Sequence, residues 1–184
     1  MCMVLWGVMV VFMVPALALT QPSHLPYVGQ EKRAIKSLAD EDSQALLDGQ
    51  GMGLAKAAEL NHYPGPRHVL DLAAQLQLSA AQRAETQQSY DRMHQEAVRL
   101  GTLIVDKERE LDQLFATQAV HSDTLRSLSQ QIAQLQGNLR LVHLQAHVEM
   151  KRVLSGEQID QYDALRGYMG QAGPAPDSGR HQHR

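Results

Sequence analysis

Two long runs of apolar residues, each recurring at alternating steps of three and four, constrain the fold of this chain most. Such spacing places the apolar side chains along one side of an α-helix, so each run predicts one long helix. Only a short turn at 118–122 separates the two helices, which are therefore expected to pack antiparallel as a helical hairpin. The first run, interrupted at Lys107, consists of Tyr90, Met93, Ala97, Leu100, Ile104, Leu111 and Leu114. The second run, interrupted at Glu149, consists of Leu125, Leu128, Ile132, Leu135, Leu139, Val142, Ala146 and Val153.

The composition agrees with an all-α fold. Aromatic residues make up only 4% of the 184 residues, whereas strands favour aromatic and β-branched side chains. A formal net charge of −3 offers no basic surface for nucleic acid, so no nucleic-acid partner is expected. The single cysteine, Cys2, excludes a disulfide within the chain and a cysteine-rich zinc site.

Two short motifs mark the starts of helices on either side of the hairpin. Leu78 and Ser79 precede Gln82, and Leu154 and Ser155 precede Gln158 in the same arrangement. Each motif is a capping box, in which the serine oxygen accepts from a free amide of the first turn and the glutamine reaches back to the cap. Short helices are therefore expected at the open end of the hairpin, over 67–76 before the first motif and over 157–168 after the second.

The chain divides into four parts. Residues 1–20 form a signal peptide or an N-terminal membrane anchor, because Val4 to Leu19 is apolar and ends in Ala16-Leu17-Ala18. No Lys or Arg precedes this run, so a membrane anchor remains an alternative, and either interpretation places the remainder of the chain outside the cytoplasm. Residues 21–66 read as a tether with short helices over 38–47 and 52–60, residues 67–168 as the hairpin domain, and residues 169–184 as a disordered tail.

Two glycines interrupt the long helices at one level of the hairpin. Residues that face each other across the turn have numbers that sum to roughly 239, which pairs Gly101 with Gly137. Glycine inside a helix costs about 1 kcal/mol relative to alanine. The pair either marks a bend or thinning of the hairpin, or consists of exposed glycines that are merely tolerated.

The two L-S-x-x-Q motifs around a long helical hairpin, behind a signal sequence, resemble the LTxxQ-motif proteins, the Spy/CpxP family of periplasmic stress proteins. The segment from Glu149 to Gln158, followed by Tyr162-Asp163-Ala164-Leu165, is also similar to the periplasmic heavy-metal-resistance sensors of the CnrX type. The resemblance covers residues 67–168. It implies a four-helix, hairpin-shaped homodimer that forms a curved cradle.

The resemblance implies two different functions. Spy-like members hold unfolded or misfolded envelope proteins without ATP, and CpxP-like members restrain a membrane sensor kinase. The sensor branch binds nickel, cobalt or similar ions through His, Glu and Met side chains and acts with membrane partners such as an anti-sigma factor. The ligand positions of that branch fall on Val69, Ala73, Tyr90 and Ala146 here, so its metal site is not carried over to this chain.

A different metal site can be built from the histidines themselves. His143 and His147 are four residues apart, so they share one helix face, and the hairpin register places His94 level with them. Three imidazoles within one turn of height could hold Zn, Ni, Co or Cu, with Met150, Met93 or Asp91 nearby. The alternative is that these are solvent-facing helix histidines in a chain with nine histidines. His181 and His183 of the tail are expected to be incidental.

No catalytic motif is present in the sequence, which lacks a G-x-S-x-G turn, a phosphate-binding glycine loop and an H-E-x-x-H pair. We therefore expect a non-enzymatic binding protein that requires no cofactor. The leading prediction is a Spy/CpxP-type chaperone or envelope-stress modulator. The alternatives are a periplasmic heavy-metal-binding sensor or resistance protein, and a purely structural dimerisation module.

Overall fold

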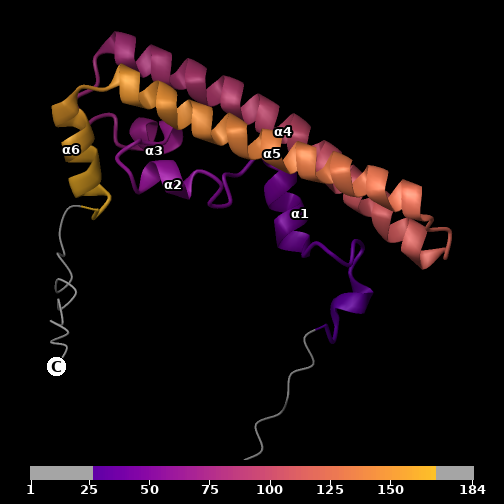
Figure 1. The fold of residues 1–184 in the computed structure, drawn as a ribbon. Coiled ribbons are helices and arrows are strands. Elements are labelled where there is room, and N and C mark those ends of the chain that lie inside the picture. The colour runs from indigo at the N-terminus through magenta and orange to yellow at the C-terminus, as the bar shows by residue number, and fades with distance from the viewer. Residues whose placement is uncertain (1–26, 169–184) are drawn as a thin grey trace, which may run out of the picture.

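The structure is a computed structural model that describes residues 27–168, and within this range it is all-helical, as predicted. Two long helices, α4 (Ala80–Ala116) and α5 (Ser122–Val153), form the antiparallel hairpin. The short helices α1 (Asp40–Leu47), α2 (Lys56–Glu59), α3 (Pro66–Asp71) and α6 (Gly156–Leu165) all lie along one side of it (Figure 1). A 3₁₀ turn, η1 (Gln30–Lys32), precedes them.

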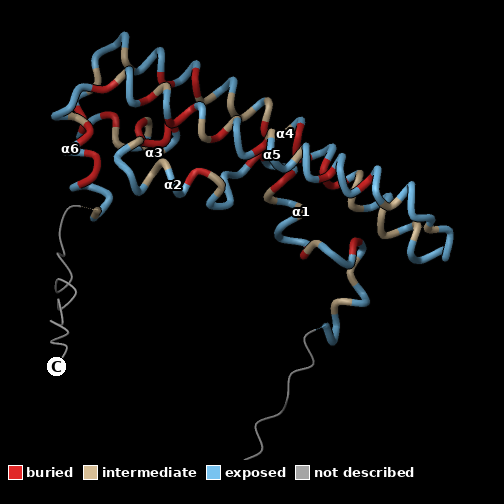
Figure 2. The backbone as a smooth tube through the Cα atoms, in the orientation of Figure 1, coloured by how far each residue is buried: buried red, intermediate tan, exposed pale blue. Residues whose placement is uncertain are grey.

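The short helices determine where the core is. Figure 2 shows that the buried positions gather in the half of the hairpin that the short helices cover, while the half near the α4–α5 turn is mostly exposed. The leader and the tail predicted for the two termini lie outside the described residues. Within residues 27–168, no helix combines the length and the apolar character needed to cross a bilayer.

Both predicted capping boxes are present. Ser79 accepts from the amide of Gln82 and Ser155 from the amide of Gln158, and each glutamine side chain accepts in turn from the backbone amide of its serine. Helix α4 therefore begins at Ala80, directly after the predicted cap, and α6 begins at Gly156, one residue before the predicted start. Helix α3 begins at Pro66, one residue before the predicted start, because proline is well suited to the first helical position.

The two capping boxes are also joined to each other. Gln82 Nε2 donates to Gln158 Oε1 at 2.7 Å, and Gln158 Nε2 donates back to Gln82 Oε1 at 3.1 Å. Each amide also donates across the junction to a backbone carbonyl, Gln82 to Val153 at 2.9 Å and Gln158 to Leu76 at 3.1 Å. We call this reciprocal pair the glutamine clasp. It fixes the starts of α4 and α6 side by side, which the separate motifs did not predict.

The segment from Ile35 to Glu59, within the part expected to be a tether, packs on the hairpin. Helix α1 approaches α4 so closely that a Cβ built on Gly101 would lie 2.0 Å from the carbonyl oxygen of Leu46. Gly101 is therefore required by the contact with α1 and is buried, contrary to the alternative that it is an exposed glycine. Gly137 meets nothing within 4 Å, so the two glycines do not share a role.

Two hydrophobic clusters form the core. The first lies where α1 crosses the hairpin and the second at the open end, between α3, α5 and α6. The first consists of Ile35, Leu46, Ala97, Leu100, Ile104, Val105 and Leu139. The second consists of Val69, Leu76, Met150, Leu154, Ile159 and Tyr162.

The two helix glycines provide a matched test of how α1 docks. Gly101→Ala is expected to lower the free energy of unfolding by about 1–3 kcal/mol, because its Cβ would displace a backbone carbonyl. Gly137→Ala is expected to raise it by up to about 1 kcal/mol, since the site is open and alanine is the better helix former. Urea unfolding followed by circular dichroism measures both, and equal effects of the two variants would contradict the close contact at Leu46.

The glutamine clasp is tested by a double-mutant cycle. Gln82→Ala and Gln158→Ala are each expected to cost about 1–3 kcal/mol, because each leaves half-buried polar groups without partners. The double variant should cost less than their sum by at least about 0.5 kcal/mol. Gln134→Ala, which removes only an exposed bond to Asn138, serves as the control and should be nearly neutral. Strict additivity of Gln82→Ala and Gln158→Ala would contradict the reciprocal pairing.

Candidate metal-binding cavity

A cavity of about 600 Å³ lies between the hairpin and the segments that cover it. Four histidines from three helices line it: His68 of α3, His94 of α4, and His143 and His147 of α5. The loop after α1 closes another side with Asp48 to Gly51, and the start of α3 contributes Gly65 to His68. The structure thus brings His94, His143 and His147 to one cavity, as the hairpin register predicted.

His143 is the most buried of these histidines, with 4% of its surface exposed. Its Nε2 is buried and has no hydrogen-bond partner within residues 27–168. Burial lowers the pKa of His143, and the neighbouring His147 and His94 lower it further, so the imidazole stays neutral and keeps a lone pair. The alternative that His143 faces solvent is therefore wrong. The histidine lies on the same inward stripe of α5 as Leu139 and Met150.

His147, 9% exposed, is also buried rather than solvent-facing. Its Nδ1 lies 2.7 Å from the carbonyl oxygen of Tyr63. A carbonyl only accepts, so Nδ1 carries the proton and Nε2 holds the lone pair of the neutral ring. Nε2 lies close to Gly65, where a Cβ would come within 3.0 Å of it. A side chain at residue 65 would therefore crowd this edge of the ring, and glycine leaves it room.

His94 is oriented in a comparable way. Its Nε2 donates to the carbonyl oxygen of Asp48 at 3.1 Å, which leaves the lone pair on Nδ1. The ring of Tyr90 stacks on it with centroids 5.5 Å apart. Metal-binding histidines commonly donate their other N–H to a carbonyl or carboxylate in this way, which fixes the tautomer of the ring.

His68 is the cavity histidine that the predicted site did not include. It is half-buried at the start of α3, and burial, followed by the charge of Arg166, lowers its pKa. In the sequence, only its position beside Val69 pointed to His68, because the resemblance to metal sensors assigns a ligand to the position of Val69. Only the packing of α3 against the hairpin brings it level with His143.

Of the remaining candidate ligands, only Met93 lies at the cavity within the described residues. Met150 is fully buried in the second hydrophobic cluster and does not line the cavity, because its position on α5 faces Val69 and Tyr162. Met93 does line the cavity. Asp91 is exposed and bonded to Gln87. His181 and His183 lie outside the described residues.

The imidazoles line the cavity walls without converging on one point. Among residues 27–168, no three histidine or carboxylate side chains are gathered as the ligands of an ion would be. Ligation by three of these rings therefore requires side chains to rotate into the cavity. Its volume of about 600 Å³ leaves room for such rotations.

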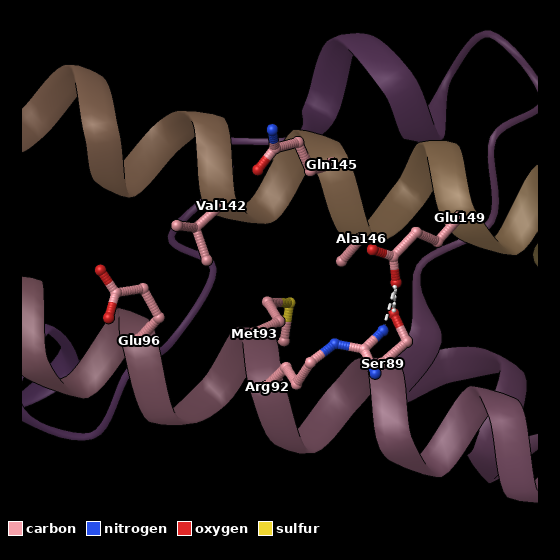
Figure 3. Close-up of a pocket in the computed structure, with 8 residues that line it drawn as sticks. All are labelled: Ser89, Arg92, Met93, Glu96, Val142, Gln145, Ala146 and Glu149. Atoms are coloured by element: carbon pink, nitrogen blue, oxygen red, sulfur yellow. Dashed lines mark hydrogen bonds and ion pairs between the residues drawn. The ribbon is translucent and has the colours of Figure 1, made fainter.

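A second, smaller cavity of about 190 Å³ lies between α4 and α5 (Figure 3). Met93 also lines this cavity, beside Ala146. Two carboxylates line it, Glu96 and Glu149. Glu149 accepts from the hydroxyl of Ser89 at 2.5 Å and from Arg92 at 3.0 Å, and both bonds are drawn in Figure 3. Glu96 is paired with Arg99. Because both carboxylates already have donors, the smaller cavity is a poorer place for a cation than the histidine cavity.

A family model described as heavy-metal resistance matches residues 51–161, more than half of the chain. The chain belongs to this heavy-metal resistance family. The family is related to the LTxxQ and CnrX-type proteins, so the predicted resemblance is confirmed. Searches among curated proteins and among solved structures gave no significant match.

The family match includes all four cavity histidines, but the ligand positions of the sensor branch are apolar here. Val69, Ala73 and Ala146 are at most 4% exposed and belong to the core. His68 and His147 each lie one residue beside such a position, and both line the cavity. Two of the four imidazoles are therefore shifted by one residue from positions that the resemblance assigns to ligands, whereas His94 and His143 are not adjacent to any of them.

Proposed function

We propose that this member of the heavy-metal resistance family binds a transition-metal ion in the histidine cavity, as a sensor or resistance protein. The observation that carries the proposal is the buried Nε2 of His143, which has no partner within residues 27–168 and lies in a cavity with three further imidazoles. A buried polar atom without a partner is costly, and it is retained most readily where a ligand satisfies it.

The donor set favours zinc, nickel, cobalt or copper over magnesium or calcium. Neutral imidazoles suit the former ions, whereas the latter prefer oxygen ligands. The carbonyls of Asp48 and Tyr63 hold the proton on one nitrogen of His94 and His147 and leave the other nitrogen free to ligate. Met93 adds a thioether on the cavity wall, which would favour a soft ion such as Cu(I).

The proposed place of action is the cell envelope. The apolar leader and its A-L-A ending support export or anchoring, and relatives of the CnrX type work in the periplasm. We propose that the protein acts without catalysis, as a homodimer, and passes on the state of its metal site to a membrane partner such as a sensor kinase or an anti-sigma factor.

Calorimetric titration tests the metal site directly. The full chain, without an affinity tag and with His181→Asn and His183→Asn to silence the tail, is expected to bind one Zn²⁺, Ni²⁺, Co²⁺ or Cu²⁺ per protomer. His143→Ala should weaken binding by more than the roughly 10–100-fold typical of losing an outer-shell partner. His121→Ala, at the exposed start of α5, is the matched control and should bind like the parent. Equal affinity of the His143→Ala and His121→Ala variants would reject the cavity as the site.

Holding of unfolded proteins is the second candidate function. The observation that favours it is the exposed apolar side chains of the long helices: Phe115 is 55% exposed, Leu141 50% and Val148 42%. Exposed apolar surface can bind unfolded chains. This function predicts that the metal-free protein suppresses aggregation of a reduced, unfolding client at near-stoichiometric ratio, and that Leu141→Ser with Val148→Ser weakens this effect. Undiminished aggregation at several-fold excess of the protein would remove this candidate.

A further inference from the structure

Glu59, the last residue of α2, lies between His147 and the end of α6. Its side chain is only 12% exposed. One carboxylate oxygen, Oε1, accepts from the hydroxyl of Tyr162 at 2.6 Å and from that of Tyr168 at 3.0 Å. The Nε of Arg166 lies 3.4 Å from the same oxygen. One oxygen of Glu59 therefore accepts two hydrogen bonds and is paired with a guanidinium, all from α6 and the residues just after it.

The other oxygen of Glu59 faces His147. Oε2 is buried and has no hydrogen-bond partner within residues 27–168. It lies 3.6 Å from Nδ1 of His147, beyond hydrogen-bond distance but within reach of a small movement. An unsatisfied buried carboxylate oxygen is costly, so a stronger donor at His147 would draw it closer.

A metal ion held by Nε2 of His147 would make the ring such a donor. The proton on Nδ1 of His147 now points to the carbonyl of Tyr63, and Nε2 is the nitrogen available to a cation. A cation on Nε2 withdraws electron density from the ring and makes Nδ1–H a stronger donor. A carboxylate accepts from such a charged donor more strongly than a neutral carbonyl does. Carboxylate–histidine–metal chains of this kind are a recurring outer shell of metal sites.

We propose that Glu59 is a positioning residue that couples metal occupancy of the cavity to α6, by shifting its hydrogen bonding from Tyr162 and Tyr168 toward His147. The coupling rests on the proposed metal-binding function and specifies how that site is regulated. When the cavity is empty, Glu59 ties the end of α6 to α2. When a metal ion occupies the cavity, the hydroxyls of the two tyrosines form weaker hydrogen bonds to Glu59. The end of α6 is then no longer held to α2.

The tyrosines themselves provide the readout. Burial and the hydrogen bond to Glu59 raise the pKa of Tyr162, and burial also raises that of Tyr168, so both hydroxyls remain protonated donors. The chain has five tyrosines, and replacing Tyr27, Tyr63 and Tyr90 with phenylalanine leaves only these two. The substitution at residue 63 keeps the backbone carbonyl that accepts from His147. Near-ultraviolet difference spectra then report the hydrogen bonds of the two hydroxyls.

In this background, titration of the full chain with Zn²⁺, which is spectroscopically silent, is expected to produce a tyrosine difference spectrum that saturates together with the calorimetric heat. Glu59→Gln should abolish the difference spectrum and weaken Zn²⁺ binding about 10–100-fold. Glu157→Gln makes the same charge change on an exposed residue of α6 and is the matched control. Binding by the Glu59→Gln variant within twofold of the control, or heat without a tyrosine signal in the background protein, would overturn the coupling.

Tyr168→Phe keeps the proposal testable if the Glu59→Gln variant does not fold. It removes one competing donor from Glu59 and is expected to tighten Zn²⁺ binding several-fold, because coupling between two sites is reciprocal. Unchanged or weaker binding would again overturn the coupling. If the unsubstituted protein gives no heat on titration with Zn²⁺, the metal site itself is rejected. If the Glu59→Gln variant binds Zn²⁺ with the affinity of the unsubstituted protein, only the role of Glu59 is rejected.

Discussion

The reciprocal hydrogen bonds between Gln82 and Gln158 are the interaction on which the arrangement of the open end depends. Each glutamine completes the capping box of its own helix and pairs with the other, so helix initiation and helix docking use the same two side chains. With the starts of α4 and α6 held together, α6 leaves the open end on the side of the hairpin where the short helices lie (Figure 1). That placement brings Tyr162 into contact with Glu59.

The position of the histidine cavity depends on how the buried apolar residues are divided between two separate hydrophobic clusters. One hydrophobic cluster forms where α1 crosses the hairpin, and the other forms where α3 and α6 meet it. Between Leu139 and Met150, which belong to different clusters, the inward stripe of α5 carries His143 and His147. Both imidazoles are buried at these positions, and burial lowers the pKa of His143, which keeps that ring neutral and available to a ligand.

Several features of the site were predictable from the sequence. The heptad spacing and the position of the turn were enough to place His94 level with His143 and His147, because an antiparallel hairpin has one register once its turn is known. Burial of His143 and His147 was not predictable, since it depends on α1 to α3 covering that side of α5. The approach of Leu46 to Gly101, and the meeting of Glu59 with Tyr162, join residues far apart in the chain and leave no periodic signal.

The sequence by itself determined the helices, their capped starts, the antiparallel hairpin and the family resemblance, because these depend on local propensity, periodicity and short motifs. Only the tertiary structure decided which side of the hairpin is covered, which histidines share a cavity, and which carboxylate faces them. The physical reason is that burial and hydrogen bonding between distant segments depend on the packing of whole elements. The chemistry of His143 and Glu59 is set by neighbours that lie far from them in the sequence.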